Sequence, residues 1–220
     1  ELKKDKNWKL KKKMCIDNDV GKPIRYFLYP ESTGNRIRQV YILKKFIDSC
    51  NLYDLKKITR VIEIGGGYGC MADIFSKFNK SINYTIFDMY EVNLLQYYYL
   101  KMNNHHPHLN KIKGRINLIN KISDLNKFIK IKNNYIFLAN WSISEFPLNF
   151  RHKFLGAIRN SKYSVISFQE NFENINNLKF FNKKLKKLKK NFIIKLNTFD
   201  HYNNSLLNKN KHYILILIKK

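Results

Sequence analysis

The chain has 220 residues and a formal net charge of +26, with 44% hydrophobic and 15% aromatic residues. This apolar content excludes a disordered chain, and a domain of this length hides roughly 70% of the surface that its unfolded chain exposes. The charge suggests a polyanionic partner, but Lys, Asn and Ile dominate throughout. A general compositional bias is therefore the favoured explanation of the charge.

Residues 1–55 are expected to form a basic, helical extension ahead of a main domain over residues 56–220. Residues 1–20 are rich in Lys and carry no apolar pattern apart from Trp8. From residue 35 to 50, apolar residues recur at helical spacing, which predicts a helix leading into the main domain.

Strands and helices then alternate along the chain. We expect strands at 60–64, 84–87, 115–119, 135–139, 163–168, 192–196 and 213–218, and helices at 71–78, 92–100, 150–158 and 174–189. Such alternation predicts a doubly wound parallel sheet with helices on both faces. Only a polar, Asn-rich loop separates the last two strands, which allows antiparallel pairing there. The expected fold is α/β and Rossmann-like, with seven mostly parallel strands and an antiparallel last strand.

The last expected helix is basic and amphipathic. Its apolar residues step by three and four along the chain, so they share one face. They are Leu178, Phe181, Leu185 and Leu188. Such a helix can lie on a membrane surface as a peripheral contact. Its place between two strands instead favours a crossover helix that packs on the sheet with its lysines toward water.

The cysteines, histidines and apolar runs argue against a disulfide-bonded, secreted, membrane-spanning or metal-binding protein. Three cysteines without metal-like spacing are typical of reduced thiols in a cytoplasmic protein. The charged N-terminus lacks the apolar stretch of a signal peptide, and the longest apolar run, 213–218, is too short to span a bilayer. His105, His106 and His108 lie too close together in one polar loop to share a tetrahedral ion easily, so we expect no metal site.

The strongest chemical signal is a run of glycines at the end of the first main-domain strand and the start of a helix. It comprises Gly65, Gly66, Gly67 and Gly69. Glycine permits positive φ and lets a ligand approach the backbone, while the helix N-terminus adds free N–H groups. Asp88 ends the next strand, where a carboxylate can accept hydrogen bonds from ribose hydroxyls. These residues predict a cofactor that contains adenosine.

The glycine spacing separates this turn from that of dinucleotide-binding proteins, which reads G-x-G-x-x-G. Glu63, inside the first strand, would repel a pyrophosphate but suits a cofactor with an ammonium and a sulfonium. S-adenosylmethionine (SAM) is such a cofactor, and an antiparallel last strand also matches a methyltransferase sheet. Two simpler roles stay open, in which Glu63 pairs with a local lysine and Asp88 caps the next helix.

The pattern E-x-G-x-G-x-G resembles motif I of class I SAM-dependent methyltransferases. Together with residues 84–92 and 96–100, it looks like a sugar O-methyltransferase family of bacterial surface-polysaccharide clusters, and residues 140–146 are similar to that family's segment after the fourth strand. The likeness covers roughly residues 20–170. Met89-Tyr90 replaces an expected Leu-Pro, and Gln39 replaces an expected aromatic residue beside Arg38.

The resemblance implies a class I methyltransferase fold and a SAM-dependent enzyme that methylates a sugar hydroxyl on a nucleotide sugar or a polysaccharide precursor. The cofactor contacts expected are Glu63, Gly65, Gly66, Gly67, Gly69, Asp88, Met89, Asn140 and Trp141. For Trp141, a plain core position is an equal alternative.

Methylation of a sugar hydroxyl calls for a general base. Glu145 is the first candidate, because it follows the carboxyl end of the fourth strand, where open α/β sheets bind ligands. The alternatives are His152, Asp200 and His201. Ser142 is expected to line the acceptor pocket, and Arg38 to contact the phosphates of a nucleotide-linked sugar unless it lies on a solvated helix face.

The net charge also invites a nucleic-acid methyltransferase. A base N-methylase would often carry an Asp or Asn followed by two prolines and an aromatic residue after the fourth strand. This chain has Asn140-Trp-Ser-Ile there, so ribose methylation is the form of this alternative that stays open. A third hypothesis is a non-catalytic partner in polysaccharide assembly, against which the intact glycine turn and Asp88 argue. The sequence does not indicate the oligomeric state.

Overall fold

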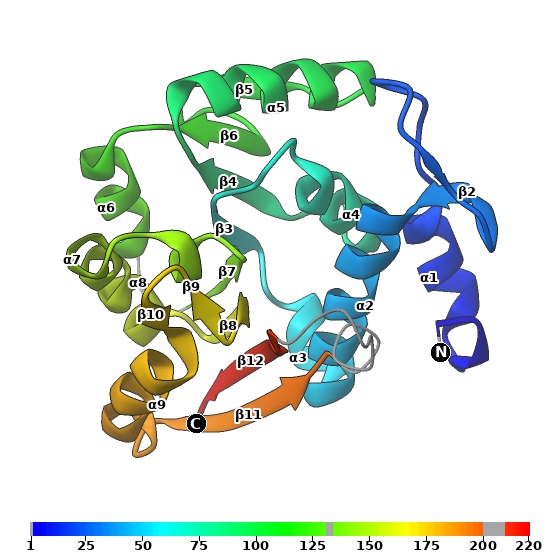
Figure 1. Cartoon of the computed structure of the whole chain (residues 1–220). Helices are drawn as coiled ribbons and strands as arrows, with labels where there is room; N and C mark the ends of the chain where they lie inside the picture. Colours follow the sequence, from blue (N-terminus) through cyan, green and yellow to red (C-terminus); the bar gives the residue numbers. More distant parts are fainter. Residues whose placement is uncertain (1, 131–133, 200–209) are drawn as a thin grey trace. The chain divides into compact units, whose positions relative to one another are not determined.

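The computed structural model describes residues 2–130, 134–199 and 210–220 (Figure 1). The chain divides into two compact units. Unit 1 comprises Glu1–Arg60 and Gly66–Asn120, and unit 2 comprises Val61–Gly65 and Lys121–Lys220. The chain thus passes between the units within the glycine turn, after Gly65. The expected division at residue 56 into an extension and a main domain stays a prediction.

The principal strands follow the order β11-β12-β8-β7-β3-β4-β6-β5. They are β3 (Arg60–Ile64), β4 (Asn83–Phe87), β5 (Pro107–Leu109), β6 (Ile116–Ile119), β7 (Tyr135–Asn140), β8 (Tyr163–Gln169), β11 (Phe192–Thr198) and β12 (His212–Lys219). β12 pairs antiparallel with both β8 and β11. The mostly parallel Rossmann-like sheet with an antiparallel last strand and helices around it is confirmed. Over the described residues the sheet has eight strands rather than seven, because the short β5 pairs in parallel with β6.

Unit 1 contains β4, β5 and β6 together with most of the N-terminal half of the chain. Its helices are η1 (Leu2–Lys4), α1 (Trp8–Cys15), α2 (Gly34–Ser49), α3 (Leu52–Lys56), α4 (Cys70–Phe78) and α5 (Tyr90–Met102), and its hairpin is β1 (Arg25–Tyr26) with β2 (Tyr29–Thr33). The N-cap of α2 is Thr33, whose hydroxyl accepts the N–H of Arg36. Helix α1 contacts both α2 and α4.

Residues 1–20, whose sequence shows no apolar pattern apart from Trp8, contain the helix α1. Helix α1 buries Met14 and Cys15, and Lys11 is only 1% exposed. The Lys11 ammonium pairs with Asp5 at 2.5 Å while its aliphatic stem packs inside. Burial by itself raises the pKa of Asp5. Hydrogen bonds from Lys11 and the Asn7 N–H outweigh this effect and lower that pKa to about 2. A lysine at a core position conceals the apolar face of this helix.

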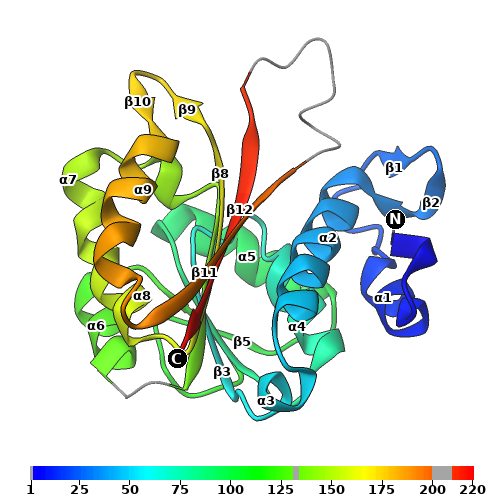
Figure 2. The same cartoon turned by 90° about the horizontal axis from the view of Figure 1, so that it is seen from below.

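Unit 2 packs its helices on one side of its strands, as Figure 2 shows for α9 beside β8 and β11. These helices are α6 (Ile122–Lys130), η2 (Ile143–Glu145), α7 (Leu148–Arg151), η3 (His152–Phe154), α8 (Leu155–Asn160) and α9 (Asn177–Leu188). The helical structure expected at 150–158 is confirmed, although a turn of 3-10 helix, η3, lies between α7 and α8. The helix expected to begin at 174 begins at Asn177, after a hairpin of β9 (Asn171–Phe172) and β10 (Ile175–Asn176).

The apolar face of α9 packs against the sheet. Phe181 lies 4.5 Å from Phe168 of β8 between ring centroids, and Leu185 and Leu188 are buried. This confirms the crossover-helix interpretation and leaves the basic face of α9 in solvent. No helix in the described part of the chain is long and apolar enough to cross a membrane. The three cysteines, all among the described residues, form no disulfide.

Candidate functional site

In unit 1, the glycine turn is tied to the end of β4. The N–H of Gly66 donates to Asp88 Oδ2 at 3.0 Å, and the N–H of Met89 donates to Oδ1 at 2.9 Å. The buried Gln96 of α5 uses Nε2 to donate to Asp88 Oδ2 at 2.8 Å and to the carbonyl of Gly67 at 2.9 Å. Burial raises the pKa of Asp88, and the donated hydrogen bonds offset only part of that effect.

These contacts fix the direction of the Asp88 carboxylate. Each carboxylate oxygen has two lone pairs, so Oδ1 can accept a hydroxyl beside the Met89 N–H. The Met89 side chain is 66% exposed. Sequence reasoning missed Gln96, because it lies within a run of apolar and tyrosine residues that marks only a helix. The structure shows that the Gln96 side-chain amide is buried and binds both Asp88 and the glycine turn.

Gly67 combines an unusual backbone conformation with empty space. Its φ is +56°, and a Cβ built there would meet no atom within 4 Å. Gly69 has φ +97° and forms the N-cap of α4. The first requirement at both positions is therefore conformational, since few residues other than glycine adopt positive φ cheaply. At Gly67, a group next to the backbone can approach without obstruction.

In unit 2, Gly65 allows the loop after β7 to approach β3 closely. Gly65 has φ +69°, and a Cβ there would lie 2.4 Å from the Cβ of Ser142. The Ser142 hydroxyl donates to the carbonyl of Ile64. Glu63, one residue earlier on β3, is 2% exposed. Ser142 thus has a structural contact of its own, and its role toward an acceptor stays a prediction.

Trp141, which follows β7, has the left-handed backbone φ of +57°. Its N–H donates to the carbonyl of Ser167 at 2.8 Å, and its indole N–H donates to His212 Nδ1 at 3.0 Å. The ring packs 6.0 Å from Phe199 between centroids, and Asn140 Oδ1 accepts the Ser167 hydroxyl at 3.0 Å. Strain of this kind at a strand end is common in functional sites, because neighbouring contacts must hold it in place.

Glu145 lies at the end of η2 in unit 2. Its Oε1 accepts a hydrogen bond from Gln169 Nε2 at 3.3 Å, and Gln169 Oε1 accepts one from the Ser144 hydroxyl at 3.4 Å. The residue is exposed overall, yet partial burial of the carboxyl raises its pKa, against a smaller lowering by Gln169. A raised pKa makes a carboxylate a stronger base.

A buried arginine holds the backbone on both sides of Glu145. Arg151 is 0% exposed, and it donates from Nη2 to the Ser144 carbonyl at 2.5 Å and from Nε to the Phe146 carbonyl at 2.6 Å. Its Nη1 donates to Asn177 Oδ1 at 2.6 Å. Burial lowers the pKa of Arg151, and no carboxylate among the described residues forms an ion pair with it. Sequence reasoning missed this residue, since nothing in its local pattern separates it from a surface arginine.

Neither a protein-family model nor a curated protein matches the sequence. Solved structures do match. A precorrin-6y C5,15-methyltransferase from Geobacter metallireducens has a TM-score of 0.60 at 11% identity, covering 94% of this chain and 98% of its own. The methyltransferase domain of bacterial CtHen1 has a TM-score of 0.57 at 14% identity, covering 84% and 98%. An O-methyltransferase family protein from Burkholderia thailandensis has 0.54 at 10% identity, covering 85% and 60%.

The chain has the methyltransferase fold. At these identities the likeness is one of fold and does not extend to a substrate. The glycine turn follows β3, and Asp88 follows β4, as expected for this fold from the sequence. The 23S rRNA methyltransferase ErmE, at a TM-score of 0.52 and 11% identity, shares the same fold.

Two further predicted site residues, His152 and Arg38, lie on helices outside the glycine turn and the loop after β7. His152 is exposed on η3, with its ring 6.3 Å from that of Phe180 on α9. Arg38 is half-buried on α2 and donates to Asn35 Oδ1 at 2.8 Å. Asp200 and His201 lie outside the described residues. Within the described ranges, no group of three His, Cys, Asp or Glu residues is placed to hold a metal ion.

Proposed function

We propose that this chain is a SAM-dependent O-methyltransferase that acts on a sugar hydroxyl, on a nucleotide sugar or a surface-polysaccharide precursor. The observation that carries the proposal is the Asp88 carboxylate, which is locked onto the glycine turn by the N–H of Gly66 and by Gln96. The methyltransferase fold supports the enzyme class. The likeness of residues 140–146 to a sugar O-methyltransferase family supports the acceptor.

The residues of the turn fit a SAM molecule. Asp88 Oδ1 keeps a lone pair for a ribose hydroxyl, and the space beside Gly67 is open. The proposed cofactor contacts in unit 1 are Gly66, Gly67, Gly69, Asp88 and Met89. Those in unit 2 are Glu63, Gly65, Asn140 and Trp141. The buried carboxylate of Glu63 complements a cationic cofactor better than a pyrophosphate.

The reaction needs a base and an orienting frame. SAM, when bound, supplies an electrophilic methyl group on a sulfonium. Glu145 accepts the proton of the sugar hydroxyl as the new O–CH₃ bond forms and the S–CH₃ bond breaks, which leaves S-adenosylhomocysteine (SAH) and a protonated carboxyl. Gln169 and Arg151 hold Glu145 in place. Precise positioning matters because methyl transfer is an in-line displacement.

A second candidate function is ribose methylation of RNA, which the net charge of +26 favours. The two candidates share the cofactor turn and differ only in the acceptor. In either case the disulfide-free cysteines support a reducing compartment, and we place the enzyme in the cytoplasm.

The cofactor assignment predicts that Gly67→Arg abolishes SAH binding, with at least a ~100-fold loss of affinity in isothermal titration. The arginine would fill the open space and force a positive φ on a residue with a long side chain. Gly156→Arg is the matched control, because a Cβ at Gly156 would also meet no atom within 4 Å while the backbone there has an ordinary φ. If the wild type binds neither SAM nor SAH, the methyltransferase proposal fails.

The base assignment predicts that Glu145→Gln lowers kcat by about 10²–10⁴-fold, while SAH affinity changes less than twofold. Because burial raises the pKa of Glu145, the wild-type rate should rise with pH through a midpoint above the ordinary glutamate value. Glu173→Gln, in the β9–β10 turn, is the control. Unchanged turnover in Glu145→Gln would remove Glu145 from this role.

Acceptor choice is tested by supplying labelled SAM with nucleotide sugars in one reaction and total RNA in another. Label in the nucleotide sugars is the expected result. Label in RNA alone would overturn the sugar assignment and leave the methyltransferase assignment intact.

A further inference from the structure

Unit 1 contains a pocket of about 460 Å³ to which the proposed function assigns no ligand. Its lining comes from the segment before β1, the N-terminus of α2, the glycine turn and α5. The size lies within the range of small-molecule sites. Tyr68, between Gly67 and Gly69, lines the pocket, so the pocket adjoins the cofactor turn.

One wall of the pocket is aromatic and fixed. The rings of Tyr68 and Tyr99 pack edge to face, with centroids 4.7 Å apart. Asn35 Nδ2 donates to the Tyr68 hydroxyl at 3.0 Å, and Arg36 Nη1 lies 3.4 Å from the Tyr99 hydroxyl. Burial raises the pKa of both phenols, which stay neutral. The hydrogen bonds therefore hold two tyrosine rings ready to contact a planar group.

Other lining residues leave apolar side chains in water. Ile24 is 93% exposed, Leu95 is 52% exposed and Tyr98 is 56% exposed, although all three line the same pocket. Apolar surface around a concavity favours a ligand that removes it from water. Pocket walls made of tyrosine and aliphatic side chains suit a flat aromatic ring.

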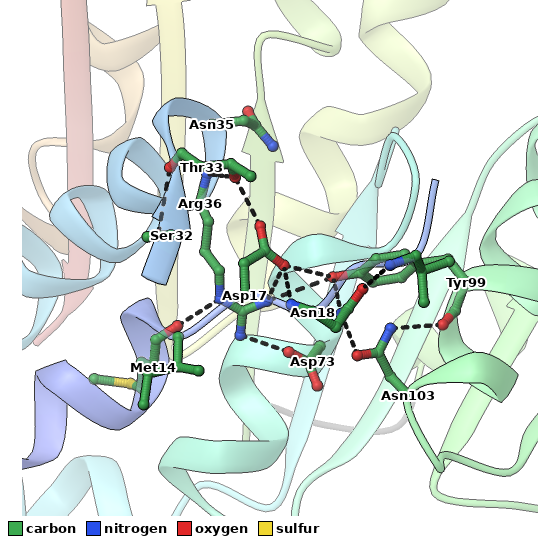
Figure 3. A network of polar contacts seen from close by, with 12 residues as sticks. Met14, Asp17, Asn18, Ser32, Thr33, Asn35, Arg36, Asp73, Tyr99 and Asn103 are labelled. Carbon is green, nitrogen blue, oxygen red and sulfur yellow. Dashed lines mark hydrogen bonds and ion pairs between the residues drawn. The ribbon is translucent and has the colours of Figure 1, made fainter. Parts of the chain in front are cut away.

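Polar groups of the pocket are few and arranged in advance. Asp17 Oδ2 accepts the Thr33 hydroxyl at 2.7 Å, and Oδ1 lies 3.3 Å from Arg36 Nη1, which offsets part of the charge of the carboxylate (Figure 3). Asp17, Thr33 and Asn35 all line the pocket. They offer donors and acceptors to the edge of a heterocycle.

Two cations lie beside the pocket, and the exposed Asp19 carboxylate next to the lining residue Val20 is paired with Arg25. Lys22 is exposed and lies between the lining residues Gly21 and Pro23. Arg38 donates to Asn35, a third lining residue, at 2.8 Å. Because Arg36 offsets part of the charge of Asp17, Lys22 and Arg38 can complement an anionic ligand. An aromatic ring that carries negative charge is the chemistry of a nucleotide.

We infer that this pocket binds a nucleoside 5′-diphosphate, with the base against the exposed Tyr98 and the fixed pair of Tyr68 and Tyr99, and with the phosphates toward Lys22 and Arg38. The inference rests on the proposed function, in which the nucleoside diphosphate is the carrier part of the sugar acceptor. Of the two proposed acceptors, this inference favours a nucleotide-linked sugar over a polysaccharide precursor that carries no nucleotide.

The test is isothermal titration of the full chain with UDP, CDP, GDP, ADP and dTDP, with and without saturating SAH. We expect one or more of these to bind in both conditions. Tyr98→Ala should weaken binding at least ~10-fold, because the loss of base stacking has an effect of that size. Tyr97→Ala is the matched control on the same helix, outside the pocket lining, and should change affinity less than twofold.

The phosphate contact is tested separately. Lys22→Ala should weaken the diphosphate about 3- to 10-fold and flatten the dependence of affinity on salt, while leaving the parent nucleoside unaffected. Lys80→Ala, an exposed lysine after α4, is the control.

Three results would overturn the inference. SAH binding without binding of any nucleotide would remove it and leave the proposed function standing. Competition between the nucleotide and SAH would place the nucleotide in the cofactor site instead. Equal effects of Tyr98→Ala and Tyr97→Ala would exclude this pocket. Nucleotide binding by a protein that binds no SAH would support the pocket and defeat the proposed function.

Discussion

Replacing Arg36 with Gln should lower the free energy of unfolding by about 3–5 kcal/mol, because it leaves the buried Asp17 carboxylate without a cation and the buried Asp73 carboxylate with Lys77 alone. The Arg36 side chain is 0% exposed, and Nη2 lies 2.5 Å from Asp73 Oδ2. Its Nε donates to the Met14 carbonyl at 2.6 Å, and Nη1 reaches Asp17 and Tyr99 (Figure 3). One side chain thus joins α1, α2, α4 and α5.

The measurement is urea unfolding followed by circular dichroism at pH 7. Lys57→Gln is the control, because Lys57 pairs with Asp54 and both side chains are more than half exposed, at 58% and 51%. A surface pair of this kind contributes about 1 kcal/mol or less. The double variant Arg36→Met with Asp73→Asn should recover part of the loss, since it removes one of the stranded charges. Equal midpoints for Arg36→Gln and Lys57→Gln would contradict the prediction.

The same cluster sets a dependence on acid. Burial by itself raises the pKa of Asp73, but the hydrogen bond with His105 and the charges of Arg36 and Lys77 outweigh it and hold that pKa well below its usual range. A lowered folded-state pKa stabilises the protein fully above the ordinary aspartate value of about 3.9, and this contribution disappears as the pH falls below it. The stability gap between wild type and Arg36→Gln should therefore be smaller at pH 3 than at pH 7.

The sequence predicts the parts of this protein that local chemistry determines. The strand at 60–64 and the positions of the glycine turn and Asp88 agree with the structure, because short apolar strands, glycines and strand-end carboxylates are recognised within a few residues. Gly65 shows the limit of such reasoning. The sequence predicts that Gly65 lets a cofactor approach the backbone. The structure adds a second reason for glycine at this position, since a Cβ there would overlap the Cβ of Ser142.

What the sequence could not predict depends on contacts between distant residues. Arg36 meets Asp17 and Asp73 only after folding, across separations that no periodicity reports. Helix α1 was missed because Lys11 occupies a core position, where its partner Asp5 compensates the charge. The short strand β5 was missed because Pro107 begins it and because, among the described strands, it pairs with β6 alone.

Arg151 is another buried residue whose contacts form only after folding. Its replacement gives the second large expected effect, a loss of turnover. Lys has no planar fork, so Arg151→Lys keeps the charge but cannot bind the carbonyls of Ser144 and Phe146 together. The backbone on either side of Glu145 should loosen. We expect kcat to fall about 10- to 100-fold, with little change in SAH affinity, because small misplacements of a reacting group are costly.

Two readouts separate positioning from general damage to the fold. Loosening should hydrate the Glu145 carboxyl and reduce the burial that raises its pKa, so the acid limb of the rate profile should move to lower pH. In the Glu145→Gln background, Arg151→Lys should cause little further loss of turnover, because both changes act on one group. A full additional loss in that background would show that Arg151 supports the fold rather than the base. If the two effects are not additive, the proton acceptor and the arginine behind it form a single functional unit.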